Sequence, residues 1–349
     1  MAASLYNPFL PRLLFLPLLA FLGLVPLSAR AAAYHVVDLG ALTQWPNDNS
    51  EAFGVNDSGM VVGNVLYGGV HGWWWKPGQG SHPVGPLARF FHDCEPTRVN
   101  NSDVATGSTP WIVRPQAFHF RPGHGLQGLG ILQLPGHSEG WDINERGDVA
   151  GTSFYDNGFD LVPQAFYWSQ ETGMIGVPLL EQGGESHGFG LNALGTVVGY
   201  SSITVGGIKR SRAIRWSQKG GTQNLGVLAG CNDSFGYAVN SSGTVVGHCT
   251  TPGFDDLGFY WTEKAGMVQF AQHCRPFAVS DHGEIIGTVG ALGPFSYTTV
   301  TGTVVLNQNL DMASMGWHLN TANDVNESGW IVGRGSLNGH LSAYLAIPQ

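Results

Sequence analysis

The stretch VNDSGMVVG, from Val55 to Gly63, returns along the chain in near-copies such as VNSSGTVVG from Val239 and VNESGWIVG from Val325. Each copy has an anchor residue, usually Asn, and a Gly seven positions later. The anchors are Asn56, Asn100, Asn144, Asn192, Asn240, Ser280 and Asn326. The chain therefore contains seven units at intervals of 40 to 48 residues. This period is typical of units of four strands.

The motif predicts a β-hairpin. Strand-favouring residues such as AFGV (Ala52 to Val55) precede the anchor, and β-branched runs such as TVVG follow it. An Asn side chain can bond its own backbone two residues on, and the Gly at the fourth position tolerates the left-handed conformation of a tight turn. The second unit has Asp103 in that position, and Asp also visits this region. Seven hairpins need seven such corners, so folding explains why the motif recurs.

Two weaker repeats accompany the hairpin. An aromatic strand follows it, as in HGWWWKPG from His71 and LGFYWTEKAG from Leu257. A short apolar strand comes next, as in PVGPL from Pro83 and NLGVL from Asn224. We name the four expected strands A and B for the hairpin, C for the aromatic strand and D for the apolar one.

The two ends of the repeat fit each other. The segment YHVVDLGAL from Tyr34 is a D strand with no A, B or C before it, and LSAYLAIPQ from Leu341 is a C strand with no D after it. If the first strand completes the last sheet, the array closes into a ring that leaves no long exposed edge. We therefore predict an all-β fold: a seven-bladed β-propeller over residues 34–349 with four-stranded blades, closed by its N-terminal strand.

Residues 1–33 stand outside the repeat. An apolar run of 15 residues, Leu13 to Leu27, follows Arg12, and small residues in SARAAA offer cleavage after Ala31 or Ala33. The run contains two prolines and is shorter than the roughly 20 residues that a membrane span needs. It predicts a secretory signal peptide rather than a retained anchor, and hence a secreted or periplasmic protein without a stable membrane span.

Composition limits the partners. Only 12% of residues are charged, 51 are Gly and the net charge is −9, which suits many short strands and turns rather than a disordered or helical chain. Nucleic acid is not an expected partner of so acidic a protein. No H-E-x-x-H or C-x-x-C motif occurs, and no phosphate-binding glycine pattern opens a helix, so we expect no cofactor, no metal ligands and no catalytic residues.

The four cysteines predict disulfides, because an even count in an exported chain usually does. Three connectivities are possible for Cys94, Cys231, Cys249 and Cys274. All four are expected in the D to A or B to C connections, which share one face of a propeller. We favour a Cys231–Cys249 pair, because these two flank one hairpin at its open end. That choice leaves Cys94 and Cys274 in blades that are not adjacent, and four unpaired thiols are the alternative.

The three repeats together resemble the HAF repeat of bacterial extracellular proteins. The shared pattern is DLG-L, then A-x-x-V/I-N-x-x-G-x-V-V-G, then x-A-F-x-W, and it covers essentially all of residues 34–349. The His of the H-A-F triplet is mostly replaced, as in Gln116-Ala117-Phe118. The unit also resembles the kelch type of propeller blade in length and aromatic content. The resemblance implies an exported repeat protein of a family without an established activity, so it assigns no catalytic residue.

Residues that depart from the repeat are the candidates for function, because folding explains the others. Most lie in the D to A connections, on the face that carries the cysteines and close to the expected channel mouth. The predicted ligand-binding residues are His92, Asp93, His137, Glu139, Glu185, His187, Asn232, Asp233 and His273. Ordinary solvated loop residues are the alternative, because loops are polar and no pair shows fixed ligand spacing. The B to C loops with Asp156, Asp160, Asp255 and Asp256 do not match a calcium loop.

Two classes of function remain. The first is a secreted or periplasmic non-enzymatic binding module, expected to be a monomer, whose loops meet a glycan or a protein surface. The second is a hydrolase or lyase that acts on an extracellular polysaccharide, with His and acidic residues at the channel mouth as acid and base. The low charge and the missing motifs favour the first.

Overall fold

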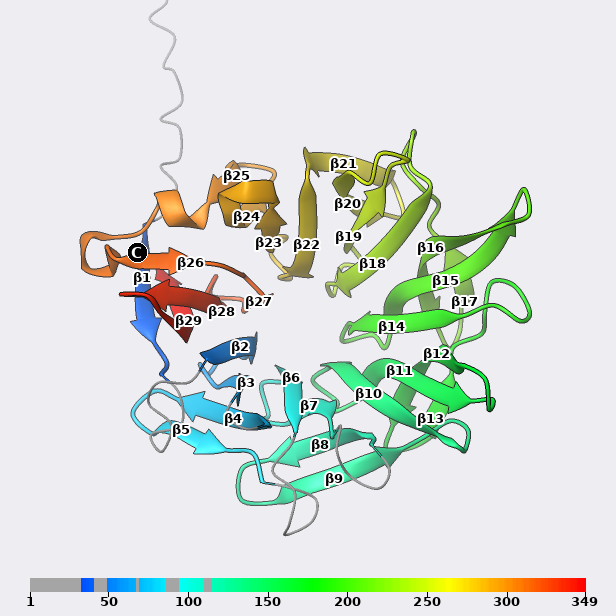
Figure 1. Cartoon of the computed structure of the whole chain (residues 1–349), viewed down its shortest axis with the longest axis horizontal. Coiled ribbons are helices and arrows are strands. Elements are labelled where there is room, and N and C mark those ends of the chain that lie inside the picture. Colours follow the sequence, from blue (N-terminus) through cyan, green and yellow to red (C-terminus); the bar gives the residue numbers. More distant parts are fainter. Residues whose placement is uncertain (1–32, 41–48, 67–68, 86–93, 110–114) are drawn as a thin grey trace, which may run out of the picture. The chain divides into compact units, whose positions relative to one another are not determined.

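The protein is a seven-bladed β-propeller, as the repeat predicts. The computed structural model describes residues 33–40, 49–66, 69–85, 94–109 and 115–349, which all belong to one compact unit, Ala31–Gln349. These residues form seven antiparallel sheets arranged around a central axis (Figure 1). Each blade has four strand positions, which run from the axis outward in the order A, B, C and D.

We number the blades from the first complete hairpin. The innermost A strands are β2 (Asn49–Val55), β6 (Glu95–Val99), β10 (Gly136–Ile143), β14 (Ser186–Leu191), β18 (Asp233–Val239), β22 (Cys274–Val279) and, in blade 7, β26 (Trp317–Leu319) with β27 (Asp324–Val325). The B strands are β3 (Val61–Leu66), β7 (Ala105–Ser108), β11 (Val149–Asp156), β15 (Val197–Val205), β19 (Val245–Thr250), β23 (Ile285–Val289) and β28 (Ile331–Leu337).

The outer two positions of each blade complete the sheets. The C strands are β4 (Val70–Lys76), β8 (Ala117–Arg121), β12 (Leu161–Ser169), β16 (Ile208–Ser217), β20 (Asp256–Thr262), β24 (Gly293–Thr298) and β29 (His340–Pro348). The D strands are β5 (Gly80–Pro83), β9 (Gly125–Gly130), β13 (Gly173–Gly176), β17 (Gly221–Asn224), β21 (Gly266–Gln272), β25 (Gly302–Val305) and β1 (Tyr34–Asp38). Three short 3₁₀ turns are η1 (Gly290–Leu292), η2 (Leu306–Gln308) and η3 (Met312–Ser314).

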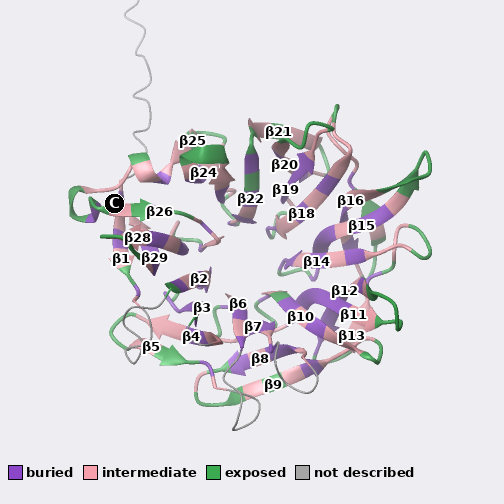
Figure 2. Ribbon diagram, in the orientation of Figure 1, coloured by how far each residue is buried: buried purple, intermediate pink, exposed green. Residues whose placement is uncertain are grey.

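The ring closes through the N-terminal strand, which confirms the prediction. Strand β1 pairs antiparallel with β29, from Tyr34 opposite Pro348 to Asp38 opposite Tyr344. The Tyr344 side chain is fully buried in the core of blade 7, where Tyr34 also packs. Figure 2 shows that burial follows the radial order, with exposed residues gathered on outer strands such as β5 and β25. Two segments about 300 residues apart therefore share one sheet and one core.

The D strands lie slightly earlier than the sequence suggests. The apolar stretches that mark them, such as PVGPL and NLGVL, begin where the outer strand ends, because β5 ends at Pro83 and β17 at Asn224. The first apolar residue after the strand is buried and still bonds to the C strand. Val84 N donates to Gly72 O at 2.9 Å, and Leu225 N donates to Ala213 O at 2.9 Å. The apolar stretches therefore mark the segment just after each outer strand, where the chain turns toward the blade and covers its core.

The turn of the motif has the expected conformation. At the fourth position, the six glycines have φ between 73° and 83°, and Asp103 has φ 61°. The anchor Asn side chain accepts from the backbone two residues on, as Leu194 N does to Asn192 Oδ1 at 3.1 Å. The buried anchor amides also point toward the next blade. Each Asn Nδ2 donates to the carbonyl oxygen of the next anchor at 2.9–3.2 Å, around six of the seven blade junctions.

We call this circle of bonds the asparagine belt. Its one gap follows Ser280, whose shorter side chain accepts from Glu284 N within its own turn instead. The belt ties the hairpin ends of the A strands together around the axis. It also accounts for four of the five N-x-S triplets, since Asn56, Asn100, Asn240 and Asn326 are 3–5% exposed.

The Gly that ends each motif permits a β-bulge. In blades 1 to 6 the A strand bulges at the residue three before the anchor, where the register with the B strand shifts by one. The backbone of the A strand then comes very close to this Gly. A Cβ atom built on any of the seven would lie 1.8–2.1 Å from a carbonyl oxygen, for example that of His187 for Gly199. No side chain fits there, so glycine is a geometric requirement.

A small polar residue six positions before the anchor links neighbouring blades. Ser138 Oγ accepts from Ala117 N of the preceding blade at 2.9 Å and donates to Gly130 O at 2.6 Å. Ser50, Ser186 and Ser234 accept in the same way from the C strand of the blade before. We call these serines the latch residues. Residues 136–140 and 184–188 match the G-x-S-x-G pattern of serine hydrolases, yet their serines are fully buried latches.

The disulfide between Cys231 and Cys249 is formed, which confirms the favoured pair. It joins the connection before β18 to the end of β19, so Cys249 lies in a strand and not in the loop that the sequence predicts. The prediction that Cys94 and Cys274 are also disulfide-bonded is wrong. Both occupy the latch position of blades 2 and 6, where their thiols are buried; Cys94 Sγ lies 3.5 Å from Val84 O. They replace latch serines, which explains why they lie in separate sheets.

Candidate functional site

One bulged side chain from each blade enters the channel. Because a bulge turns its extra residue out of the pairing pattern, the residue three before each anchor faces the axis rather than the sheet. Blade 7 places a residue at the same position, in the connection between β26 and β27. We call these residues the bulge ring: Phe53, Thr97, Trp141, Phe189, Tyr237, Phe277 and Asn323. Five of the seven are aromatic.

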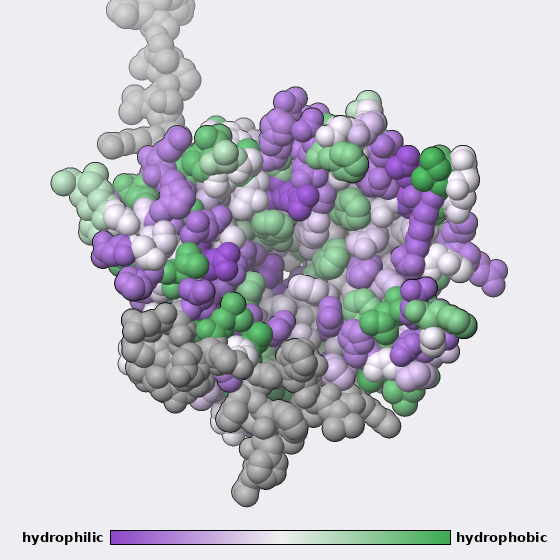
Figure 3. Space-filling view, in the orientation of Figure 1, coloured by the Kyte–Doolittle hydropathy of each residue, from purple (hydrophilic) through white to green (hydrophobic). Residues whose placement is uncertain are grey.

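The bulge ring lines a pocket of about 290 Å³ on the axis, and of the residues that the structure describes Arg98 also lines it. Neighbouring rings contact each other along blades 3 to 6. The centroids lie 5.8 Å apart for Trp141 and Phe189, 5.5 Å for Phe189 and Tyr237, and 5.9 Å for Tyr237 and Phe277. Figure 3 views one face of the ring, which is hollowed at its centre. We call the end of the channel beside this pocket, where the D to A connections lie, the loop mouth.

A charged cluster forms the waist of the channel, one residue closer to the anchors. Arg98 Nε lies 3.6 Å from Asp324 Oδ1, and the guanidinium donates to Phe53 O at 2.6 Å and to Asn323 O at 3.1 Å. Asp142 Oδ2 accepts from Leu191 N at 2.7 Å. Burial raises the pKa of Asp142 to about 7, against the opposing effect of Arg98. Burial also raises the pKa of Asp324. Two carboxylates therefore share one guanidinium between the two halves of the channel.

The opposite end of the channel, the turn mouth, is polar and acidic. Its pocket of about 320 Å³ is lined by the inner strands of all seven blades. The residue after the anchor is acidic in four blades and accepts an amide from the preceding blade, as when Glu327 N donates to Asp57 Oδ1 at 2.9 Å and Ser241 N to Asp281 Oδ1 at 2.6 Å. These carboxylates therefore hold neighbouring blades together. Their role in the fold accounts for the acidic character of the turn mouth.

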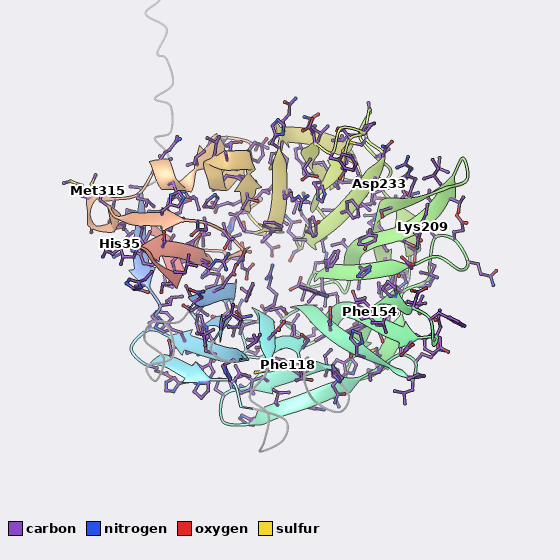
Figure 4. The ribbon with its side chains drawn as sticks, viewed as in Figure 1. His35, Phe118, Phe154, Lys209, Asp233 and Met315 are labelled. Atoms are coloured by element: carbon purple, nitrogen blue, oxygen red, sulfur yellow. A yellow bond between two sulfur atoms is a disulfide. The ribbon has the colours of Figure 1, made fainter. Side chains whose placement is uncertain are left out.

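Three of the predicted residues meet at the loop mouth. His137 Nε2 lies 3.9 Å from Glu139 Oε1 on strand β10. The His137 ring stacks on Phe154 at 4.4 Å, and Phe154 contacts His187 of the next blade at 5.8 Å. Figure 4 labels Phe154. His187 in turn contacts Phe189 of the bulge ring at 5.9 Å. Burial lowers the pKa of both histidines and so favours their neutral forms.

A second pocket of about 270 Å³ adjoins the first and contains Glu139. It shares Phe53, Thr97 and Trp141 with the bulge-ring pocket, and it adds Glu95. Burial raises the pKa of Glu139, and the charge of Glu95 raises it further. The two carboxylates thus repel each other across blades 2 and 3.

The remaining predicted residues are held in local contacts away from these pockets. Glu185 pairs with Lys209 Nζ at 2.5 Å, and Asp233 accepts from Ser211 N at 2.7 Å beside Arg210 (Figure 4). The backbone carbonyl of Asn232 accepts from Arg212 at 2.9 Å. His273 is exposed, 3.4 Å from Asp255. His92 and Asp93 lie outside the described residues.

The acidic B to C loops show contacts of their own. Asp256 binds Arg275 Nε at 2.6 Å and lies 3.4 Å from His248 Nε2. Asp156 accepts from Gly158 N at 2.8 Å within its loop. Among the described residues, no group of three His, Cys, Asp or Glu side chains is arranged to hold a metal ion.

Sequence reasoning missed the bulge ring and the waist, whereas Glu95 lies in the same stretch of sequence as the predicted His92 and Asp93. A signal was present, because the position three before the anchor is aromatic in five of seven units. In the sequence, however, these residues stand among the strand-favouring residues that precede the anchor, such as AFGV. The bulge that turns these side chains inward is not visible in a single copy of the motif.

Comparisons with known proteins agree on the fold. No protein-family model matches the chain, and no curated protein matches it in sequence. Among solved structures, the chain is similar to virginiamycin B lyase from Staphylococcus aureus, at 9% identity and a TM-score of 0.55 over 90% of this chain and 100% of that one. It is also similar to a streptogramin B lyase, at 10% identity and a TM-score of 0.53 over 89% and 97% of the two chains. A third likeness is to YCF48 bound to D1 peptide, at 9% identity and a TM-score of 0.50 over 91% and 97%.

At such low identity these likenesses show the propeller fold alone. The same fold carries a lyase in two of the neighbours and a peptide-binding protein in the third, so function has to be argued from the site. In the part of the chain that the structure describes, no helix has the length and apolar character that crossing a membrane requires.

Proposed function

We propose that this protein is an exported binding module of the HAF-repeat type, whose ligand enters the loop mouth and contacts the bulge ring. The observation that carries the proposal is the aromatic ring itself. Seven blades each contribute one side chain to a pocket of about 290 Å³, and five of these side chains are aromatic although they lie outside the blade cores. Apolar concave pockets with a few polar groups at the rim are typical of ligand sites.

The arrangement supports binding by a preformed site. The bulge-ring residues stand on strands whose backbone is fixed by the latch residues and the asparagine belt, so little conformational entropy is lost on binding. His137, Glu139 and His187 supply polar groups at the rim of the pocket. All three are among the ligand-binding residues that the sequence predicts near the channel mouth.

Export is part of the proposal. The apolar run Leu13 to Leu27 and the small residues after it support a signal peptide over residues 1–33, with the propeller as residues 34–349. The Cys231–Cys249 disulfide supports an oxidising compartment, either the periplasm or the medium. We propose that the module acts as a monomer.

The test measures ligand binding by the protein and by three variants. Wild-type protein is screened on glycan and peptide arrays and, by thermal shift, against small molecules. Trp141→Ala and Tyr237→Ala are expected to weaken binding of the hits by about tenfold or more, as loss of a stacking ring does. Phe159→Ala removes an aromatic ring that is 94% exposed in a B to C loop, and it should bind as wild type does. Hits that bind both channel variants normally would place the ligand elsewhere and overturn the proposal.

A hydrolase or lyase is the second candidate, and one observation favours it. Glu139 combines a raised pKa with a His137 neighbour 3.9 Å away, which is the environment that a general acid requires. A polysaccharide panel decides between the two functions. Turnover that is lost in Glu139→Gln, with binding retained, would establish the enzyme; binding of a polymer without turnover supports the module.

A further inference from the structure

The bulge ring encloses its ligand from several sides. Trp141, Phe189, Tyr237 and Phe277 form a continuous wall of rings over four blades, and Phe53 stands on the other side of blade 2. Because the side chains come from around one axis, a group that enters the pocket meets aromatic side chains from five of the seven blades, with Thr97, Arg98 and Asn323 completing the lining. This arrangement is a cage and differs from the flat platform on which a sugar ring stacks.

The cage offers few hydrogen bonds. Thr97 Oγ1 already donates to Gly140 O at 3.0 Å. Asn323 Nδ2 donates to Glu51 Oε1 and to Ala52 O, both at 2.9 Å. The Arg98 guanidinium is used by three backbone carbonyls and by Asp324. A ligand rich in hydroxyl groups would therefore replace only part of its bonds to water here, which costs affinity.

Negative charge lies on both sides of the cage. Glu95 and Glu139 line the adjoining pocket, which shares Phe53, Thr97 and Trp141 with the cage. Asp142 and Asp324 lie beneath it at the waist. Among the described residues, four carboxyl groups therefore lie in the pockets next to the cage, and Arg98 is the basic side chain that lines the cage itself. Burial and the charge of Glu95 raise the pKa of Glu139, and burial raises the pKa of Asp142, so a bound cation would favour the charged form of each.

We propose that the cage binds an alkylated ammonium group, such as the trimethylammonium of a choline-like small molecule. This inference rests on the proposed function and specifies its ligand. The faces of aromatic rings attract a cation through their quadrupole, and the attraction grows when water is excluded. The alkyl groups fill apolar surface and need no hydrogen-bond partner, and the surrounding carboxylates balance the charge.

The experiment compares choline with its neutral carbon isostere, 3,3-dimethylbutan-1-ol. The two have the same shape, so a difference in affinity reports the charge. Isothermal titration is expected to show choline binding about tenfold tighter or more, as a desolvated cation–π site should. Trp141→Ala should reduce choline affinity by a similar factor, and Phe159→Ala should leave it unchanged. Glu139→Gln should weaken choline severalfold and leave the isostere unaffected, with folding of each variant checked by circular dichroism.

A second arm asks where the ammonium group comes from. Free choline competes with phosphatidylcholine vesicles for the protein in a sedimentation assay. Binding to choline without retention on vesicles supports a small-molecule ligand, and vesicle binding that depends on Trp141 supports a lipid headgroup with the same chemistry.

The outcomes separate this inference from the proposed function. Equal affinity for choline and its isostere, or choline binding that Trp141→Ala does not change, would overturn the cation cage. If a neutral ligand from the screen still depends on Trp141 and Tyr237, the binding module stands and only the ligand class is wrong. If no ligand depends on these residues, both proposals fail.

Discussion

At the scale of single residues, each recurring residue of the motif has its own structural role. The anchor Asn shapes the turn and reaches the next blade, the Gly four positions into the motif takes a positive φ, and the final Gly makes room for the bulged backbone. The residue three before the anchor has none of these tasks. The side chain at this position can therefore vary among the seven copies, and it decides which chemical groups line the channel.

The final Gly of a motif is expected to tolerate no side chain. In Gly199→Ala the new Cβ would lie 1.8 Å from His187 O, so strands β14 and β15 would have to separate. We expect a loss of at least about 3 kcal/mol in the free energy of unfolding, measured by urea denaturation. Gly253→Ala, in an exposed loop where a Cβ meets ordinary contacts, is the matched control. Equal midpoints for the two variants would show that the close approach is not strained.

The waist of the channel should make stability depend on pH through Asp142. Burial raises its pKa to about 7, above that of an Asp in the unfolded chain, so the folded protein keeps a proton that the unfolded chain releases. Stabilisation that is complete below about pH 4 is lost as the pH rises through about 7. Asp142→Asn removes this titration and should lose less stability than wild type between pH 5 and pH 8, measured by thermal unfolding.

Other groups also contribute to the pH dependence: burial lowers the pKa of His248 to about 4, so its contribution changes between about pH 4 and the ordinary pKa of His, 6.5. The difference between the variant and wild-type profiles isolates Asp142. Asp156→Asn, on an exposed loop, should follow the wild-type profile. Parallel profiles for Asp142→Asn and wild type would contradict the buried titration.

At the scale of elements, the hairpins act together because each reaches the next. The asparagine belt has six bonds and one gap, at Ser280. The Ser280→Asn variant should place an amide within reach of Asn326 O and close the belt, since the same turn holds Asn in the other six blades. One further buried hydrogen bond should raise the free energy of unfolding by about 1 kcal/mol, measured by the urea midpoint.

The opposite change gives the control. Asn192→Ser removes one bond of the belt and should lower stability by about 1 kcal/mol, because Asn240 O loses one of its two donors and keeps only Gly243 N. If Asn192→Ser destabilises the protein while Ser280→Asn changes nothing, the bonds stabilise single turns and the belt is not a unit.

The elements also show how far a sequence can be read. The hairpins, the number of blades and the closing strand could be predicted, because a tight turn depends on a few residue types and the same residues recur in each of the seven units. The limits of the D strands could not, since an apolar residue such as Val84 looks the same in a strand and just beyond it. The disulfide partner of Cys231 followed from proximity within one hairpin, whereas Cys94 and Cys274 required knowledge of the latch position.

The candidate site was predicted less well than the fold. His137, Glu139 and His187 were found because they depart from the repeat, and they do lie at the loop mouth. Trp141 and Tyr237 were missed, because an aromatic residue in a strand is usually a core residue. A channel arises only when seven copies converge, so no single copy shows which of its side chains meet there.

At the scale of the whole molecule, the ring depends on the pairing of its two ends. Gln349 N donates to Ala33 O at 2.8 Å, and β1 completes the sheet of β29. A circular permutant that joins residue 349 to residue 33 by a short linker, with new ends between Gly206 and Gly207, should keep the fold, because these glycines lie in an exposed hairpin loop. Deletion of residues 1–40 should expose the core around Tyr344 and abolish cooperative unfolding.

Circular dichroism and thermal unfolding of both proteins check this expectation. The permutant is expected to melt within a few degrees of wild type, since no strand is lost. A truncated protein that melts as wild type does would mean that blade 7 is stable with three strands, and that closure contributes nothing.

The position of the bulge-ring side chains has a consequence for protein design. A side chain that stands outside the strand ladder can be exchanged without disturbing a turn, a latch or a belt bond, so the lining of the channel is free to drift while the scaffold stays constant. The bulge-ring positions, one per blade, then determine ligand specificity independently of the residues that hold the fold together. Because Thr97 and Asn323 also bond to neighbouring blades, randomising only the five aromatic positions should yield a library of equally stable propellers with new ligand preferences.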